Sequence, residues 1–393
     1  MSPLDRRQVL RLLGAAGAAG ATAPVLAACS TTSQAGSAQQ SPVRIGLVIP
    51  KTGPGKAIGD ELNAGFQLYL KLHGEQLGGR AVQLSTEDEG TSADSGRAAV
   101  DRLLKGSVHA LSGVVSSAVM SAISDHVESA QVPLLGSAAS PGTLGTVKYI
   151  WRTSYVNTDP GTALGGYLGG KTDKALIVAD DSSTSQEQVN AFTAAFNGIL
   201  HHPELAGTVR VPNGGSFTAA FDAIRTGGVR NVFACFSGDG AAAFLKAYRS
   251  AGLNVRLHAP GFMTEGADSL QRLGDPAMGL YTAMNYGPDL DNPANRMFAA
   301  EYQRIYGNPP STYAMASYDA AAVLAKAVVL AGADLSPQAL NTALSGVGAL
   351  DSPRGAWQFN QSRTPLQRWY LRQVRKDGQV TSNTVLGDIG MLG

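Results

Sequence analysis

The sequence predicts an α/β protein with a parallel sheet at the core of each of two halves, and three observations support this prediction. Short apolar runs rich in β-branched residues alternate with amphipathic segments of helical period along most of the chain. A length of 393 residues exceeds what one hydrophobic core usually holds, so two domains are expected. Hydrophobic residues make up 44% of the chain, which is enough for an ordinary globular interior.

The first 28 residues have the pattern of an export signal. Arg6 and Arg7 precede a weakly apolar stretch at 12–25, which is too short to span a membrane as a helix. Paired arginines before such a stretch resemble a twin-arginine signal. The stretch is followed by LAAC, which resembles a bacterial lipobox whose cysteine, here Cys29, accepts lipid before cleavage. The alternative is a signal peptide that is cut nearby, with Cys29 incidental.

Residues 29–42 are polar and lack any apolar periodicity, so they predict a flexible tether of roughly 20 Å. The folded part would then stay close to the outer face of the bacterial cytoplasmic membrane. Cys235 has no partner for a disulfide, and neither cysteine belongs to a CxxC or Cys/His cluster, so no metal site is expected. The twin-arginine route carries folded cargo, which agrees with a fold that needs no disulfide.

The first half of the folded part opens with a β-branched strand at 43–50, which a Gly/Pro-rich turn at 52–55 ends. An amphipathic helix follows at 60–73, with Leu62, Phe66 and Leu70 turned inward. Further strands are expected at 82–85, 108–115, 132–135 and 148–154, and further helices at 93–105 and 118–130.

Two neighbouring strands of this half, 108–115 and 132–135, both end in small, hydroxyl-rich turns. Ser116 and Ser117 stand where the next helix starts, and GSAASP follows the second strand at 136–141. In an open α/β sheet, ligands bind outside the carboxyl ends of the strands. Free N–H groups and the helix dipole there favour a carboxylate or another anion. The alternative is that these small residues only cap and pack.

A second αβ series follows a chain crossing at 157–160. Strands are expected at 175–179, 208–212, 231–236, 255–259 and 279–285, and helices at 186–200, 217–226 and 240–251. Helices at 295–306, 313–330 and 337–344 and strands at 356–359 and 367–375 complete the chain. The segment 313–330 is apolar, but Asp319 and Lys326 interrupt it, which indicates a core helix and not a membrane span.

Several other functions are disfavoured by the residues. Gly53-x-Gly55 follows a strand, but no acidic residue follows a clear second strand, and Lys56 is followed by Ala57, so nucleotide binding is not expected. No GxSxG or HExxH motif supports a hydrolase. The formal charge of the whole chain is +1, which gives no electrostatic reason to expect a nucleic acid partner. No cofactor is expected.

Five motifs in order resemble the type I periplasmic binding proteins, in particular their branched-chain amino-acid, leucine-binding-like group. The motifs are TGP with a later Gly-Asp at 52–60, GVVSS at 113–117, VPLLGSAASP at 132–141, LKAYRSAGL at 245–253 and DSPRGAWQF at 351–359. The resemblance implies two Rossmann-like lobes joined by three hinge crossings, with the ligand in the cleft between them. Lobe 1 would comprise 43–157 and 286–352, and lobe 2 would comprise 158–285 and 353–393.

The resemblance also implies ligand-binding positions. Ser117 lies where the family holds an α-carboxylate. Ser137 lies where a backbone carbonyl takes the ligand amine, and Ala139, after Ala138, lies where a Thr touches the carboxylate. Tyr313 lies where an aromatic side chain lines the pocket.

The other half of the implied pocket departs from the family pattern. Family aromatics are replaced by Ile58, Thr184 and Ser237, and the family's acidic partner for the ligand amine falls near Phe262. Losing that carboxylate removes a charge-assisted hydrogen bond of about 1.5–3 kcal/mol. The acidic residues that could replace it, or could be solvated loop acids, are Asp181, Asp239 and Glu265. Recognition of an ammonium group therefore stays open.

The resemblance implies a substrate-binding lipoprotein of an ABC importer that captures a small carboxylate-bearing solute, such as an amino acid, and passes it to ABC permease membrane subunits. Such a protein catalyses no reaction. A solute that is a non-amino organic acid or an amide is an alternative. A ligand-sensing lipoprotein of the same fold that signals to a membrane partner is another.

Overall fold

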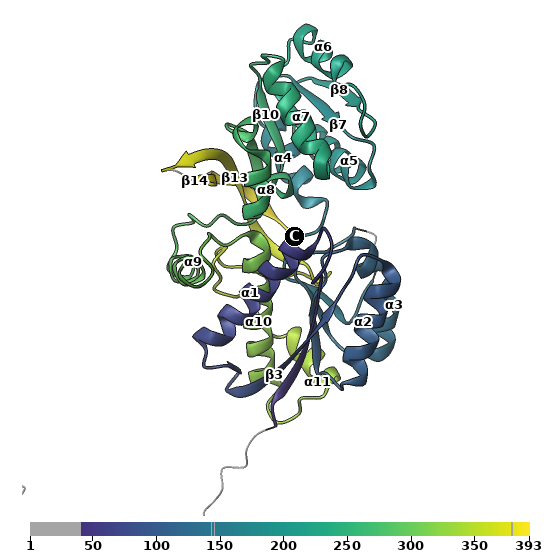
Figure 1. Ribbon diagram of the computed structural model, residues 1–393, viewed down its shortest axis with the longest axis vertical. Coiled ribbons are helices and arrows are strands. Elements are labelled where there is room, and N and C mark those ends of the chain that lie inside the picture. The colour runs from purple at the N-terminus through teal and green to yellow at the C-terminus, as the bar shows by residue number, and fades with distance from the viewer. Residues whose placement is uncertain (1–40, 143, 145, 379) are drawn as a thin grey trace, which may run out of the picture. The chain divides into compact units, whose positions relative to one another are not determined.

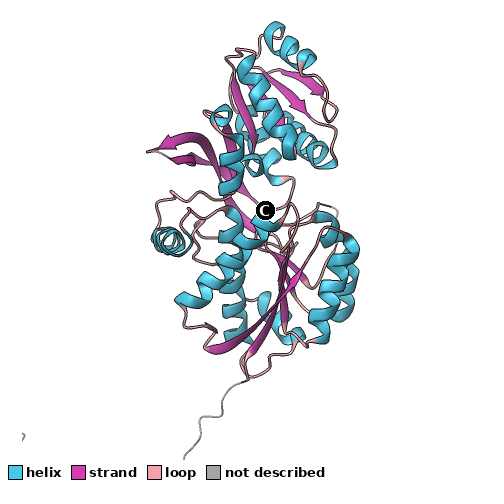
Figure 2. Cartoon of the chain, in the orientation of Figure 1, coloured by secondary structure: helices cyan, strands magenta, loops and turns pink. Residues whose placement is uncertain are grey.

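The computed structural model describes residues 41–142, 144, 146–378 and 380–393 (Figure 1). The predicted signal peptide, Cys29 and all but the last two residues of the predicted tether lie outside the described residues. The described chain contains two sheets, and helices flank each of them (Figure 2). The predicted α/β fold with two lobes is confirmed.

The first lobe, which we call the six-stranded lobe, is built on a sheet of order β2-β3-β1-β4-β5-β6. Its strands are β1 (Val43–Ile49), β2 (Gln76–Leu77), β3 (Arg80–Asp88), β4 (Ala110–Gly113), β5 (Leu134–Gly136) and β6 (Ile150–Arg152). Every neighbouring pair is parallel except β2 with β3, which joins at a tight antiparallel turn. The carboxyl ends of β1, β4, β5 and β6 therefore lie along one edge of the sheet.

Helices cover both faces of this sheet (Figure 1). The helices of the six-stranded lobe are α1 (Lys56–Leu72), α2 (Ala93–Lys105), α3 (Ser117–Ala130), α9 (Pro293–Tyr306), α10 (Thr312–Ala331) and α11 (Pro337–Leu344). Helices α1 and α10 bury one core with Phe66 and Leu324, and α2 and α3 bury another with Val100 and Ile123. Residues distant in sequence thus complete this lobe.

Among the described residues, α10 is the one helix long and apolar enough to cross a membrane by length and composition. Most of that helix is buried, because it packs between α1 and α11. The buried position agrees with the prediction that the segment 313–330 is a core helix, which rested on the interruption of its apolar run by Asp319 and Lys326.

The second lobe, the eight-stranded lobe, has the order β12-β13-β11-β10-β9-β7-β8, with β14 paired to β13. Its strands are β7 (Ala175–Ala179), β8 (Leu205–Arg210), β9 (Asn231–Cys235), β10 (Arg256–Pro260), β11 (Tyr281–Met284), β12 (Gln358–Phe359), β13 (Pro365–Asp377) and β14 (Val380–Leu392). Strands β7 to β11 pair in parallel, but β12, β13 and β14 pair antiparallel. The core of this sheet is therefore parallel, as predicted, and the three antiparallel strands extend one edge of it.

The helices of the eight-stranded lobe are α4 (Asp159–Gly169), α5 (Ser183–Asn197), α6 (Thr218–Thr226), α7 (Gly238–Ser250) and α8 (Ala267–Leu273), with short 3₁₀ turns η2 (Gly261–Thr264) and η3 (Asp275–Ala277). Helices α4 and α5 approach each other closely, because α4 carries glycine at every fourth position on the facing side. A Cβ atom would come within 2.5 Å of the Gln188 carbonyl oxygen at Gly161 and within 2.3 Å of the Phe192 carbonyl oxygen at Gly165. Only glycine allows that spacing.

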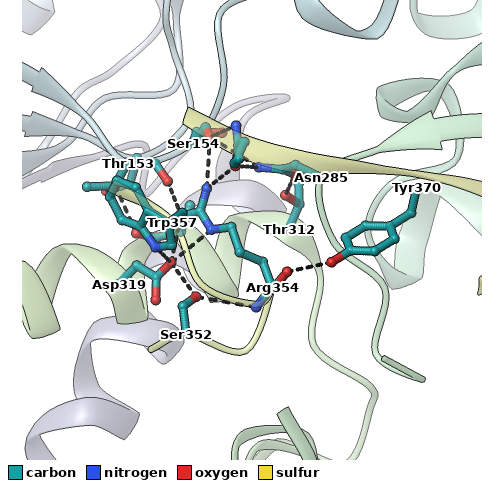
Figure 3. A network of polar contacts seen from close by, with 12 residues as sticks. Thr153, Ser154, Asn285, Thr312, Asp319, Ser352, Arg354, Trp357 and Tyr370 are labelled. Atoms are coloured by element: carbon teal, nitrogen blue, oxygen red, sulfur yellow. Dashed lines mark hydrogen bonds and ion pairs between the residues drawn. The ribbon is translucent and has the colours of Figure 1, made fainter. Parts of the chain in front are cut away.

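The chain passes between the lobes three times: after β6, after β11 and after α11. A buried polar network joins these three crossings (Figure 3). Its centre is the Arg354 guanidinium, 1% exposed, which contacts the Asp319 carboxylate of α10 at 2.6 Å. Arg354 also donates to the backbone carbonyls of Thr153 and Ser154 in the first crossing. Asn285 of the second crossing donates to the Ser154 carbonyl at 3.1 Å. The crossings are thus held by one set of hydrogen bonds.

Candidate ligand-binding site

A cavity of about 210 Å³ lies at the carboxyl edge of the six-stranded sheet and takes residues from both lobes. It is lined by Ile58, Val115, Ser117, Ala138, Ala139, Tyr155, Asn157, Thr184, Gln188, Phe262 and Tyr313. The volume is about seven times what one water molecule takes up in the liquid. A single-ring or short branched solute fits this space.

A larger hollow of about 520 Å³ lies between α1, α10 and the β2–β3 turn. Gly78 and Gly79, which line it, precede β3, so this hollow lies at the amino end of that strand. Ligands of open α/β sheets bind at the carboxyl ends. The smaller cavity is therefore the candidate site.

The turn between β4 and α3 forms one end of the cavity. Ser116 caps α3, since its hydroxyl oxygen accepts the N–H of Val119 at 3.3 Å. Glu89, buried behind the turn, accepts the N–H groups of Val115 at 2.8 Å and Ser116 at 2.7 Å. A helix leaves its first N–H groups without intrahelical acceptors. That of Ser117, which lines the cavity, therefore remains for a ligand.

The turns after β4 and β5 lie side by side, as the sequence predicted. The N–H of Ala139 donates to the Val114 carbonyl at 2.9 Å, and the N–H of Ser137 donates to that of Gly113 at 2.9 Å. Ala138 and Ala139 line the cavity together with Ser117. Val114 adopts φ of 65°, a rare conformation for a β-branched residue, which holds the β4 turn in this shape.

The hydroxyl of Ser117 is oriented by Asn157. Asn157 Nδ2 donates to Ser117 Oγ at 3.1 Å, so the serine oxygen accepts and its own O–H is left to donate into the cavity. Asn157 is itself held from both lobes. Its N–H donates to the Ser140 carbonyl at 3.0 Å, and its carbonyl accepts from the Gln188 side chain of α5.

Aromatic side chains form another wall. Tyr155 and Tyr313 are buried, and their phenol groups interact with each other. Burial raises the pKa of Tyr155 and of Tyr313 above the usual tyrosine value, so both phenols are neutral near pH 7. Phe262 of η2 and Ile58 of α1 line the same cavity.

Two of the nine ligand-binding residues predicted from the sequence do not line the cavity. Ser137 is fully buried, and its hydroxyl lies 3.3 Å from that of Thr153 and 3.4 Å from that of Ser112. Ser237 is exposed, and its N–H donates to Asp180 at 2.8 Å. The other seven, including Thr184 of the eight-stranded lobe, line it.

The three acidic residues considered as amine partners do not line the cavity either. Asp181 and Asp239 are exposed. Glu265 is 6% exposed, and its carboxylate accepts the N–H of Thr312 at 2.7 Å and pairs with Arg372 at 2.8 Å. This carboxylate links the eight-stranded lobe to the first turn of α10.

Sequence reasoning missed four lining residues: Val115, Tyr155, Asn157 and Gln188. Tyr155 and Asn157 directly follow β6, the strand next to β5. The rule that ligands bind beyond strand ends applies to this third strand as well and would have indicated them. Gln188 lines the cavity because α5 packs closely on α4. The regular spacing of glycines in α4 is the sequence feature that indicates this close packing.

Two α/β lobes joined by three crossings, with a solute-sized cavity at the strand ends, define the class of bilobed solute-binding proteins. The chain belongs to the periplasmic binding protein family, whose model matches residues 42–379. It is 29% identical over 346 residues to Leu/Ile/Val-binding protein homolog 6 of Brucella melitensis, covering 85% of this chain and 88% of that protein. The predicted family is therefore confirmed.

Solved structures agree with this assignment. An ABC transporter solute-binding protein of R. palustris in complex with benzoate is 26% identical, with a TM-score of 0.76, and the match covers 89% of this chain and 97% of that one. A leucine-binding protein of Thermotoga maritima is 20% identical, with a TM-score of 0.74, and the match covers 87% and 99%. Proteins of this family bind solutes for ABC transporters outside the cytoplasm and are not enzymes. The chain is thus an exported, non-catalytic solute-binding protein.

Proposed function

We propose that the protein is a substrate-binding lipoprotein of an ABC importer that captures a small carboxylate-bearing solute in the 210 Å³ cavity. The observation that supports this most directly is the start of α3. There Ser117 lines the cavity, and its hydroxyl and its backbone N–H are available as donors. The solute then passes to the permease subunits of the importer.

A carboxylate suits this group of donors for two reasons. Hydrogen bonds to a charged acceptor are shorter and stronger than neutral ones. The N-terminus of a helix also carries a partial positive charge, which contributes about 0.3–1 kcal/mol to an adjacent anion. Asn157 and Glu89 keep the donors pointed at the cavity before the solute arrives, so little ordering entropy is lost on binding.

The related structures support a carboxylate as the shared feature. The R. palustris protein was crystallised with benzoate, and another solute-binding protein of that species with 4-hydroxybenzoate. A branched-chain amino acid binding protein of Streptococcus pneumoniae was crystallised with isoleucine. These ligands differ in their bodies and have the carboxylate in common.

The solute also links the two lobes. Ser117 and Ala139 belong to the six-stranded lobe, whereas Thr184 and Phe262 belong to the eight-stranded lobe. A solute that touches both lobes binds more tightly when the lobes are placed so that both contacts form. It stabilises that placement by the difference between its affinities for the two placements of the lobes. A permease that recognises this arrangement then distinguishes loaded from empty protein.

Replacing Ser117 tests the site. We expect Ser117→Ala to weaken carboxylate binding about 10- to 100-fold, because a hydrogen bond to a charged group is worth about 1.5–3 kcal/mol. Isothermal titration calorimetry on a panel of small carboxylates measures it. Ser121→Ala, an exposed serine on the same helix, is the matched control and should bind like the wild type. Equal affinities for all three proteins would contradict the proposed site.

The lipid anchor is tested with the two cysteines. We expect Cys29→Ser to release the protein from the membrane fraction in a bacterial host. Cys235→Ser should stay anchored, because that thiol is buried in the eight-stranded lobe. Fractionation and the intact mass of the mature N-terminus measure both. Membrane association of the Cys29→Ser protein would reject the anchor.

A further inference from the structure

The charges around the cavity define the kind of carboxylate that it accepts, provided that the proposed function holds. None of the described residues that line the cavity is acidic. Its polar lining consists of hydroxyl, phenol and amide groups, all of them neutral. An α-amino acid brings a second charge, an ammonium group, only one carbon away from its carboxylate. That ammonium would have to be neutralised within the same small space.

The carboxylates of the turns and helices around the cavity are already used by the protein. Glu61 of α1 accepts the hydroxyl of Ser311. Glu89 accepts two backbone N–H groups behind the β4–α3 turn and is 1% exposed. Glu265 is held by Arg372 and by the N–H of Thr312. Arg372 is fully buried, so drawing Glu265 toward a ligand would leave a buried guanidinium without its counter-charge.

The same holds in the eight-stranded lobe and at the first crossing. Asp180 accepts the N–H of Ser237 at 2.8 Å and the N–H of Ser182 at 3.0 Å. Asp159 accepts the N–H of Val156 at 2.9 Å. Each of these carboxylates shapes a turn next to the cavity, and none lines it.

Neutral acceptors do not replace the missing charge. The Asn157 carbonyl accepts from the Gln188 side chain, and the phenol groups of Tyr155 and Tyr313 interact with each other. The Gln188 side-chain oxygen has no hydrogen-bond partner among the described residues. It lies against α4, since a Cβ at Gly161 would come within 3.0 Å of it, and it is neutral, so it offers an ammonium no opposite charge. An ammonium buried beside such groups loses its hydration without gaining an opposite charge.

We infer that the solute is a carboxylate whose remaining body is uncharged, of single-ring or short branched size, and that the protein rejects α-amino acids. The start of α3 binds the carboxylate. The body lies against Ile58, Phe262 and the two tyrosines, where apolar surface and neutral hydrogen-bonding groups alternate. Amino acids are rejected because their ammonium group would be buried without an opposite charge. A buried polar group left unpaired discriminates strongly against the ligand that carries it.

Matched pairs of ligands test this inference by titration calorimetry on the purified folded chain. Each pair shares its skeleton: 4-methylpentanoate with leucine, and 4-(hydroxymethyl)benzoate with 4-(aminomethyl)benzoate. We expect the member without the ammonium group to bind in at least one pair, and to bind about 100-fold or more tightly than its ammonium-bearing partner. Equal or tighter binding of leucine or of the aminomethyl compound would overturn the inference but leave the proposed carboxylate site intact. Binding of no carboxylate at all would overturn both.

A charge introduced at Thr184 gives a second, independent measurement. Thr184 is exposed on the first turn of α5 and lines the cavity, so its replacement should not disturb folding. We expect Thr184→Asp to raise the affinity for the ammonium-bearing ligands, relative to the partners that lack the ammonium group, by about 10-fold or more. Thr184→Asn, equal in size and neutral, should leave the ratio unchanged. An unchanged ratio in Thr184→Asp, with a wild-type preference for amino acids, would overturn the inference.

Discussion

Glu89 is the residue whose protonation most affects the turn in front of α3. It is buried, and its carboxylate accepts the N–H groups of Val115 and Ser116. Burial, with a smaller contribution from the nearby Asp88, raises the pKa of Glu89 to about 7, against the lowering effect of the two amide hydrogen bonds. The folded protein therefore binds this proton more tightly than the unfolded chain does.

The stabilisation from this proton is present below pH 4.5 and is lost as the pH rises through about 7. We expect this one group to lower the free energy of unfolding by on the order of 3 kcal/mol across that window. Urea unfolding of the wild type and of Glu89→Gln between pH 4 and about 8 measures this effect. The free energy of unfolding should fall more steeply with rising pH in the wild type than in Glu89→Gln. The comparison is needed because Asp159, whose pKa burial raises to about 7, acts in the same direction. His258, whose pKa burial lowers to about 3, acts in the opposite direction. Parallel pH profiles of the two proteins would contradict this role of Glu89.

The residues of the site divide into those that local sequence reveals and those that it does not. Ser117, Ala138 and Ala139 could be predicted because they directly follow strands whose ends must be neighbours. The role of Glu265 could not, because its partner Arg372 lies 107 residues away and is reached only through the pairing of β13 with β11. Such a partner is selected by tertiary structure and leaves no local pattern.

At the scale of elements, the glycines of α4 decide how closely α4 and α5 pack. A Cβ at Gly165 would come within 2.3 Å of the Phe192 carbonyl oxygen, whereas a Cβ at Gly166 would meet nothing within 4 Å. Both positions are helical, so they differ in packing and not in backbone conformation.

We expect Gly165→Ala to destabilise the protein by about 1–2 kcal/mol, because overpacking costs about 1–3 kcal/mol and helix propensity returns up to about 1 kcal/mol. Gly166→Ala should stabilise it by up to about 1 kcal/mol. Thermal and urea unfolding of both variants measure whether the free energy of unfolding falls in Gly165→Ala and rises in Gly166→Ala. A Gly165→Ala protein as stable as Gly166→Ala would show that the helices can move apart at no cost.

The strands of the sheet cores were predictable because buried parallel strands are continuous apolar runs, as in Ala175–Ala179. Strand β14 was missed for the opposite reason. It is a largely exposed edge strand with glycines at 387 and 390, so neither an apolar run nor a clear alternation marks it. It forms a strand because it pairs along its length with β13. Gly378, with φ of 60°, allows the turn that brings the two strands together.

At the scale of the whole molecule, the Arg354 network ties the crossings together. The Asp319 carboxylate accepts from Ser352 at 2.8 Å and from the Trp357 indole N–H at 2.9 Å, besides its pair with Arg354. Because these groups are buried, removing one charge leaves the other without compensation. The sequence marked the DSPRGAWQF motif and Asp319 separately, but it could not show that they meet.

We expect Arg354→Met and Asp319→Leu each to destabilise the protein by about 3–5 kcal/mol. The double variant should be more stable than either single one, because no unpaired charge remains. Urea unfolding of the three proteins measures this cycle. The exposed pair of Arg225 and Asp222 serves as the control, and Asp222→Asn should change stability little. Additive losses in the Arg354 cycle would contradict the coupling.

One consequence of this network concerns motion. Since a single guanidinium holds carbonyls of the first crossing and the carboxylate of α10, the crossings cannot slide past one another independently. A swing of one lobe against the other would therefore require torsions in the residues that flank this network. Tyr155 and Asn157 are two of these residues and also line the cavity, so such a swing would reshape the cavity wall as well.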